Sequence, residues 1–581
     1  MDRIQTINKL ELLPNEILIE CFRYLETVQM FYSFDQLNSR YNRLIRRIPL
    51  HLDFRDTPRL ICDQFCQKML SDEEIKNQIF SIRLSNKDTT YGIQSFLSTF
   101  QLVDDFPHLQ SLTLVRVSKS NVIQLISTLP LLSGLSCFRL IDPQIEKKEI
   151  FSILPTCQLH TLMLSTLSKD FQITDQLSSI TNLTISECHL RDLFQILRTA
   201  SELKYLNIHH IQRYSSNRVD TNNHFSNHHA IHLKQLIIKH IEYDFSDFII
   251  ILKQTPNLNS LTLGASSDKN LVDACQWEDL ISSSLPSLKN FKFRIYYYHG
   301  NNKNGLEERF KQFQSDFWCK QHHWYTEYEL SNYEALIYTI PYIFSIYALV
   351  PHTKGRGNEL INNVNIFANV TNLRINPDAL RNERQYYFPY VISLSLRCPD
   401  LIDTLLLTAK DIQSLKVIVN FSTLQELYIP YTFQLETPSV LLEILKGAPH
   451  LSSLCIHLDI LQSLFEDDQL CQYLNKMIRK LDIGSFYDKL LDDYDRLTDI
   501  CQVFSNIEEL TCTIYRLDCL LFLIQHFSKL SRISVALGEY HLVSAVPGLE
   551  EQTHRLGMKI VADFDVYNSL LLTIHINRNT F

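Results

Sequence analysis

The chain has 581 residues, of which 45% are hydrophobic and 20% charged, so it can form large cores and we predict a folded protein rather than a disordered one. Its formal charge of −9 at pH 7 argues against a nucleic-acid partner, because phosphate contacts require a basic face. We expect neither secretion nor membrane insertion, because residues 1–13 lack an uninterrupted apolar run and the longest apolar runs are too short to span a bilayer.

The first pattern along the chain is a small helical unit at residues 12–44. Pro14 stands where a first helical turn would begin, a position that needs no backbone N–H. The apolar residues that follow recur at helical spacing on one face: Ile17, Leu18, Cys21, Phe22 and Leu25. A second stretch, residues 31–44, again has apolar residues three or four apart, which predicts a second helix. Two helices this short bury little between them, so a helical domain at residues 1–50 needs a partner or a neighbouring domain.

These residues resemble the F-box, a family motif that begins Leu-Pro-x-Glu and continues to an aromatic residue and Leu. The matching positions are Leu13-Pro14-Asn15-Glu16-Ile17-Leu18 and Phe22-Arg23-Tyr24-Leu25. The family pattern usually ends with Cys and a bulky aromatic residue, and Ser39 and Tyr41 stand at about those places. The resemblance implies that Leu13, Pro14, Ile17, Leu18, Phe22 and Leu25 contact a Skp-type adaptor, with Glu16 as a polar or capping residue. The alternative is a helix pair that only caps the domain behind it.

From residue 109 onward the chain is repetitive, with apolar residues at positions 0, +3 and +5 of each unit. The triplets are Leu109/Leu112/Leu114, Leu159/Leu162/Leu164, Ile180/Leu183/Ile185, Leu203/Leu206/Ile208, Leu233/Leu236/Ile238, Leu258/Leu261/Leu263, Val370/Leu373/Ile375, Leu424/Leu427/Ile429, Leu451/Leu454/Ile456, Ile478/Leu481/Ile483 and Leu530/Ile533/Val535. Proline often lies two residues before the first position, as at Pro107, Pro256 and Pro449, and helix-like stretches precede many units. This order predicts a solenoid of short parallel strands, each followed by a helix.

The repeat pattern resembles leucine-rich repeats of the long, helix-backed kind. Ile180, Leu183, Ile185, Cys188 and Leu190 fit the consensus of that family, whereas most other units lack its Asn or Cys at position +8. The predicted fold class is therefore α/β, with an F-box followed by an irregular leucine-rich-repeat solenoid. We predict a first block at residues 51–295 and a second block with a C-terminal cap at residues 366–581.

Two stretches interrupt the period. Residues 212–229 are polar, and the histidines His224, His228, His229 and His232 lie within this stretch or just after it. The histidines allow a metal site, but the polar composition is more typical of a solvated loop. Residues 296–365 are rich in aromatic side chains and predict either an insertion with a helix and strands or an irregular repeat. The aromatic rings there either seal a junction between the two blocks or form a partner-binding surface.

No catalytic constellation is evident, and we predict no enzyme activity, cofactor or metal. The 14 cysteines are scattered without paired spacing, which is typical of reduced core residues in an intracellular protein of the cytoplasm or nucleus. Combining the two resemblances, we expect a substrate-recognition subunit of an SCF-type (Skp-cullin-F-box) ubiquitin ligase, which binds the adaptor, and through it a cullin, and presents the repeats to an unknown protein substrate. The alternatives are a repeat scaffold unrelated to ubiquitin and, third, an enzyme site within the aromatic segment.

Overall fold

The computed structural model divides the chain into two compact units. The first comprises Met1–Tyr298 and Asn304–Trp324, and the second comprises His299–Lys303 and Tyr325–Phe581. The division falls inside residues 296–365, the segment that we predicted as an insertion. The structure describes residues 9–54, 59–86, 92–143, 159–164, 177–212, 230–266, 269–300, 304–331, 333–351, 354–356, 365–381, 386–397, 405–484, 493–514, 516–536, 551, 554, 559–564 and 571–577.

The first unit begins with short helices and continues as strands that alternate with helices. Its helices are η1 (Lys9–Leu12), α1 (Asn15–Arg23), α2 (Thr27–Phe34), α3 (Ser39–Ile45), α4 (Arg59–Ser71), α5 (Glu73–Asn77), α6 (Ile93–Thr99), α7 (Leu102–Asp105), α8 (Lys119–Ile126), η2 (Leu129–Leu131), α9 (Leu190–Thr199), α10 (Phe245–Lys253), η7 (Lys269–Val272), α11 (Ala274–Ser284), α12 (Leu306–Gln312) and the π-helical turn η8 (Phe317–Gln321). Its strands are β1 (Leu50–Asp53), β2 (Ile79–Ser85), β3 (Ser111–Val115), β4 (Cys137–Ile141), β5 (Thr161–Leu164), β6 (Asn182–His189), β7 (Tyr205–Gln212), β8 (Gln235–Ile241), β9 (Ser260–Ser266) and β10 (Asn290–Tyr298).

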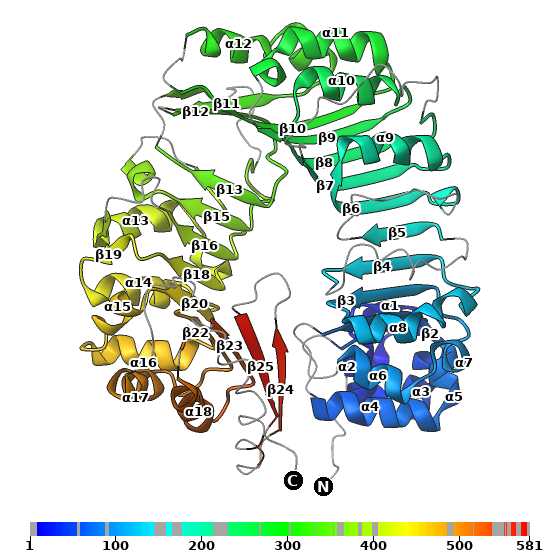
Figure 1. Ribbon diagram of the computed structural model, residues 1–581, viewed down its shortest axis with the longest axis vertical. Coiled ribbons are helices and arrows are strands. Elements are labelled where there is room, and N and C mark those ends of the chain that lie inside the picture. Colours follow the sequence, from blue (N-terminus) through cyan, green and yellow to red (C-terminus); the bar gives the residue numbers. More distant parts are fainter. Residues whose placement is uncertain are drawn as a thin grey trace. The chain divides into compact units, whose positions relative to one another are not determined.

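The ten strands of this unit follow one another in sequence order, and each is parallel to the next. Helices α9, α10 and α11 lie on one side of β6 to β10, and no described helix of the unit covers the other side of these strands (Figure 1). The architecture is thus mixed α/β with a large parallel sheet and repeated helices, consistent with the repeat solenoid that the sequence predicts.

The register of the strands aligns the apolar repeat positions. Leu183, Leu206, Leu236 and Leu261 are paired in turn across β6 to β9, so the +3 side chains form one continuous row. All members of the eleven predicted triplets are buried, with at most 5% of each residue exposed. The period read from the sequence therefore corresponds to the side of the sheet that faces the helices, where each strand packs on its neighbours.

The second unit contains a similar array. Its strands are β11 (Thr326–Leu330), β12 (Glu334–Thr339), β13 (Ile346–Leu349), β14 (Lys354–Arg356), β15 (Asn372–Ile375), β16 (Ser393–Leu396), β17 (Leu405–Leu407), β18 (Glu426–Ile429), β19 (Phe433–Leu435), β20 (Ser453–Ile456), β21 (Lys480–Asp482), β22 (Glu509–Thr513), β23 (Arg532–Ala536), β24 (Lys559–Phe564) and β25 (Leu571–Asn577). Its helices are η9 (Pro377–Arg381), α13 (Ala409–Ile418), η10 (Phe421–Thr423), α14 (Pro438–Gly447), α15 (Leu458–Gln462), α16 (Asp468–Met477), α17 (Tyr494–Val503) and α18 (Leu517–His526).

Eight strands of the second unit, β13, β15, β16, β18, β20, β21, β22 and β23, form a parallel array in that order. The final strands β25 and β24 continue it antiparallel, and this hairpin follows the last predicted repeat. At the other end, β11 pairs antiparallel with β12 and with β14. The predicted strands of the aromatic segment are therefore present: β11, β12 and β14 pair antiparallel, and β13 begins the parallel array.

We predicted a single second helix over residues 31–44. This prediction is wrong, because the structure has two helices there, α2 and α3. Asp35 after α2 is extended and Gln36 is left-handed with φ of 62°, so the helical geometry is interrupted there. Asn38 then caps α3, its side-chain oxygen accepting from the backbone N–H of Tyr41. Apolar spacing continues through the break, so periodicity alone does not reveal it.

Three of the histidines considered for a metal site, His224, His228 and His229, lie outside the described residues, and His232 is exposed just before β8.

Among the described helices, none combines the length and the apolar character needed to cross a membrane.

The aligned rows of buried side chains lead to a stability prediction. Leu236 is fully buried in the middle of its row, so Leu236→Ala should lower the free energy of unfolding by about 2–5 kcal/mol, through lost burial and the cavity left behind. Urea denaturation followed by circular dichroism measures this. Lys292→Ala, on the exposed side of β10, is the matched control, and we expect it to change the free energy by less than about 0.5 kcal/mol. Equal effects of the two substitutions would contradict the assigned register.

Several thiols are withdrawn from solvent: Cys62 and Cys188 are buried, and Cys501 is half-buried. Burial raises the pKa of Cys62 to about 12 and that of Cys501 to about 12, and it raises the pKa of Cys188 as well. Cys21, by contrast, is exposed on α1. Since the thiolate is the reactive form, we predict that iodoacetamide at pH 8 alkylates Cys21 at least about tenfold faster than Cys62, Cys188 or Cys501. Peptide mass spectrometry over a time course measures the rates, and fast labelling of Cys188 in the folded chain would refute the prediction.

Candidate protein-binding surface at the N-terminal helices

One face of helix α1 is buried against the other helices of the N-terminal helical unit. Leu18 is fully buried and Phe22 is 2% exposed, and the ring of Phe22 lies 4.9 Å from that of Phe34 and 6.1 Å from that of Tyr41. Phe34 and Tyr41 are themselves in edge contact at 5.6 Å. This cluster of three rings joins α1, α2 and α3.

The neighbouring face of α1 is apolar and largely exposed to solvent. Leu13, Ile17, Cys21 and Tyr24 follow one another at helical spacing, and Ile17 is 49% and Tyr24 83% exposed. Leu25, at 39% exposure, lies just beyond the helix end. We call these five residues the α1 outer stripe. The neighbouring segments expose three more large apolar side chains: Leu12, Tyr32 and Leu37. A stripe of exposed apolar side chains along one helix, such as the α1 outer stripe, is typical of protein-binding sites.

The structure separates the residues that the F-box resemblance implied into two groups. Pro14, Glu16, Ile17 and Leu25 are exposed, and Leu13 is half-buried. Leu18 and Phe22 face the interior, where they are unavailable to a partner in this conformation and instead fix the helix. Glu16 lies in the first turn of α1, where a negative charge favours the helix dipole, and the helix has no side-chain hydrogen bond at its N-cap.

Arg40 holds the start of α1 in place, although the sequence analysis did not single it out. Its guanidinium donates to the backbone carbonyls of Glu11 and Leu13 and to the side-chain oxygen of Asn15. Asn38 also donates to the carboxylate of Glu11, at 2.9 Å. These bonds from Asn38 and Arg40 order the residues at the start of α1, so contacts within the helical unit itself fix the Leu-Pro segment. Arg40 is 25 to 29 residues away from these partners in sequence, which is why no local pattern reveals it.

The helical unit is firmly attached to the start of the repeat array. The carboxylate of Asp35, only 3% exposed, forms ion pairs with Arg46 and with Lys68 of α4, and Arg46 also pairs with Asp72 at 2.8 Å. Both cations lie over the ring of Phe31. Burial lowers the pKa of Lys68, and the charge of Asp72 opposes this shift.

Hydrogen bonds reinforce the attachment. The hydroxyl of Thr27 donates to the carbonyl of His51 on β1, and the Gln78 amide donates to the carbonyls of Ile45 and Ile48. An open hollow of about 580 Å³ lies beside the ion pairs, with a lining of polar and charged residues: Gln36, Arg46, Gln64, Gln67, Lys68, Ser71 and Asp72. It lacks the apolar walls that a small-molecule site usually has.

The rings in the helical part of the aromatic segment are buried, whereas Tyr298 and Tyr333 of the same segment are exposed. Phe310, Phe313, Phe317, Trp318 and Trp324 are at most 7% exposed and pack on one another and on β10. The Trp324 indole donates to the carbonyl of Lys289. Of the two interpretations offered for these rings, the structure favours core packing, and His322 stacks on Trp324 at 4.1 Å between ring centres.

Another polar cluster occupies the antiparallel sheet of the second unit. The carboxylate of Glu329 on β11 accepts from the hydroxyls of Tyr338, Tyr347 and Tyr386, and Tyr338 also donates to Glu327 at 3.1 Å. Burial and these carboxylates raise the pKa of Tyr338 and Tyr347 well above the usual range. The tyrosines thus stay protonated and serve as donors to buried acids, a structural role.

Comparisons with known proteins give little beyond the geometry. No family model matches the chain, and no curated protein matches it. Among solved structures, a leucine-rich-repeat protein of Leptospira interrogans is similar at 13% identity and a TM-score of 0.21, over 80% of this chain and 97% of that one.

The ion pairs of Asp35 lead to a prediction about the attachment. We expect Asp35→Ala to lower the free energy of unfolding by about 1–3 kcal/mol, because it leaves two partly buried cations without their shared carboxylate. Glu20→Ala removes the exposed ion pair with Arg23 and should cost less than about 1 kcal/mol. Thermal and urea unfolding of both variants measure the difference. Identical stabilities would show that the Asp35 ion pairs contribute nothing to the attachment.

Proposed function

We propose that this chain is an F-box protein with irregular leucine-rich repeats that serves as the substrate-recognition subunit of an SCF-type ubiquitin ligase. The F-box match at residues 13–25 supports the proposal, and the observation that carries it is the α1 outer stripe. Apolar side chains of a motif that exists to bind an adaptor must be accessible, and those of Leu13, Ile17 and Leu25 are at least partly so.

In this proposal the two faces of α1 have different roles. Leu13, Pro14, Ile17 and Leu25 contact the Skp-type adaptor, and Cys21 and Tyr24 extend the same surface. Leu18 and Phe22 position the helix from inside, and Arg40 orders its start. The sequence analysis assigned adaptor contacts to Leu18 and Phe22 as well, and the proposal replaces those contacts with a supporting role.

The repeats would bind a protein substrate, and the face of β6 to β10 that no described helix covers is the surface proposed for it (Figure 1). The chain itself would make and break no covalent bonds. It would raise the effective concentration of a substrate lysine near a ubiquitin-carrying enzyme that the adaptor and cullin hold. The proposal includes no cofactor, no nucleic acid and no membrane partner, and it places the protein in the cytoplasm or nucleus.

A second candidate function is a repeat scaffold outside any ubiquitin pathway, with the N-terminal helices as a cap. The attachment of these helices to the array favours it, because the Asp35 ion pairs and the bonds from Thr27 and Gln78 are what a cap requires. A cap has no need for an exposed apolar helix face, however, whereas an adaptor site does. Adaptor binding therefore distinguishes the two functions.

We predict that a purified Skp-type adaptor captures the full chain and that Ile17→Ser combined with Leu25→Ser weakens capture about tenfold or more, because both side chains would be central apolar contacts. Both positions are exposed, so the double variant should remain folded by circular dichroism. Leu131→Ser, which changes an apolar side chain 64% exposed elsewhere in the same unit, is the matched control and should bind like the wild type.

Cys21 provides an independent readout because its thiol lies within the α1 outer stripe. Bound adaptor should slow alkylation of Cys21 and leave that of the exposed Cys275 unchanged. Absence of capture by the folded wild type, with no protection of Cys21, would refute the ligase function and favour the scaffold.

A further inference from the structure

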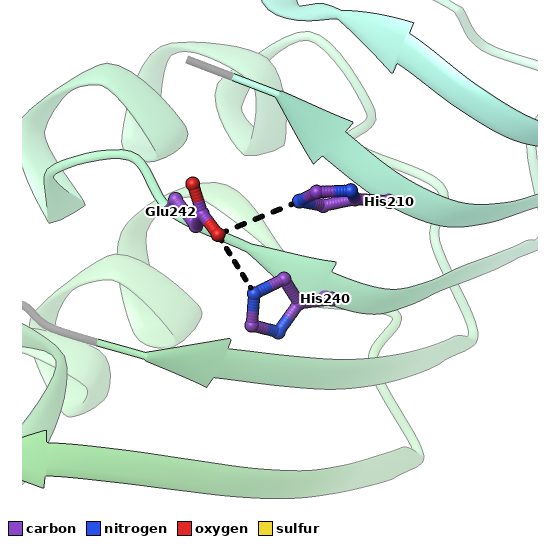
Figure 2. A group of neighbouring side chains, drawn as sticks. All are labelled: His210, His240 and Glu242. Carbon is purple, nitrogen blue, oxygen red and sulfur yellow. Dashed lines mark hydrogen bonds and ion pairs between the residues drawn. The ribbon is translucent and has the colours of Figure 1, made fainter. Parts of the chain in front are cut away.

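Three potential metal ligands converge where β7 and β8 end. His210 on β7 and His240 on β8 are paired in register, so their side chains stand next to each other on neighbouring parallel strands. Glu242 follows β8 directly, and its carboxylate points toward both imidazole rings (Figure 2). The two histidines occupy the same place in successive repeats, seven residues after Leu203 and Leu233 respectively. The cluster is therefore a product of the repeat register.

The distances suit a single small cation. One carboxylate oxygen of Glu242 lies 3.2 Å from Nε2 of His240 and 3.6 Å from Nε2 of His210. The three ligand atoms all lie within 4.8 Å of one another. Nitrogen and oxygen ligands around tetrahedral Zn²⁺ at about 2.0–2.1 Å are separated by about 3.4 Å, so only small adjustments would bring all three onto one ion.

Hydrogen bonding within the cluster leaves one group unsatisfied. Glu242 is within hydrogen-bond distance of His240 only, and Nε2 of His210 is shielded from solvent without a hydrogen-bond partner among the described residues. The rings of His210 and His240 are 4.9 Å apart, close enough that two protonated imidazoles would repel. A cation between the three groups would satisfy both nitrogens and the carboxylate at once.

The site is open to an ion from solution. The side chains of His210, His240 and Glu242 are 31%, 36% and 46% exposed. Glu187 on β6 is paired in register with His210 and adds a carboxylate to the same row of the sheet, which raises the local attraction for a cation. Two of the three ligands lie on strands, and backbone pairing fixes the strand positions without the metal.

We propose that His210, His240 and Glu242 bind a divalent transition-metal ion, Zn²⁺ in preference to hard cations, because imidazole nitrogen is a poor ligand for Mg²⁺ and Ca²⁺. Three protein ligands leave the fourth position of a tetrahedral ion for water or for a side chain of a bound protein. The site is independent of the proposed ligase function. The sequence analysis predicted no metal, and the histidines that it considered at residues 224–232 are different ones.

The test is isothermal titration of the full chain with Zn²⁺, in parallel with His240→Ala and Glu242→Gln. Loss of one ligand should weaken Zn²⁺ binding about tenfold or more. His160→Ala is the matched control, since His160 is also an exposed histidine of the same sheet, beside β5, and it should leave the affinity unchanged. Circular dichroism verifies that each variant is folded.

A second readout and a second variant distinguish metal binding at this site from metal binding by other histidines of the chain. Co²⁺ in place of Zn²⁺ should give the visible absorption of tetrahedral coordination in the wild type, and Glu242→Gln should abolish it. A triple variant with alanine at His224, His228 and His229 should keep both signals. Wild-type affinity in His240→Ala and Glu242→Gln, absence of Zn²⁺ binding by the wild type, or loss of binding in the triple variant alone would overturn the proposal.

Discussion

The register between neighbouring parallel strands is the constraint on which the rest of this structure depends. In each unit the strands pair so that +3 side chains lie beside +3 side chains, as Leu183, Leu206, Leu236 and Leu261 do. A strand with its helix cannot bury this apolar row alone, since the row is completed only by the strands on either side. A shift of one residue would turn every apolar side chain to the other face of the sheet. Stability in such an array is therefore shared between neighbours.

The same register decides where polar and functional groups can lie. The apolar triplets fill the helix-facing side of the parallel strands, and the ionisable residues of the metal cluster lie outside those rows. His210 and His240 occupy one repeat position on adjacent strands, and pairing brings them together. A repeat protein can thus place two ligands side by side when one residue type recurs at one position. Glu242 completes the group because it directly follows β8, two residues after His240.

The N-terminal helices follow a different rule, because they have too little material for a core of their own. Three rings from three helices hold the unit together, and the Asp35 ion pairs join it to the array. This arrangement leaves the α1 outer stripe without a covering element among the described residues. Attachment on one side and exposed apolar surface on the other suit a helical unit that connects a repeat array to a separate protein.

The sequence by itself determined the repeat period, the apolar triplets, the helix between strands and the location of the N-terminal helical unit, because all of these follow from local spacing of apolar residues. Only the tertiary structure decided which apolar residues of α1 face outward, since Leu18 and Ile17 are neighbours in sequence and differ only in what packs against them. It also decided that Trp318 is core, that Arg40 fixes the start of α1, and that His210 meets His240 and Glu242. Each of these depends on contacts between residues far apart in the chain, and such contacts leave no periodic signal in the sequence.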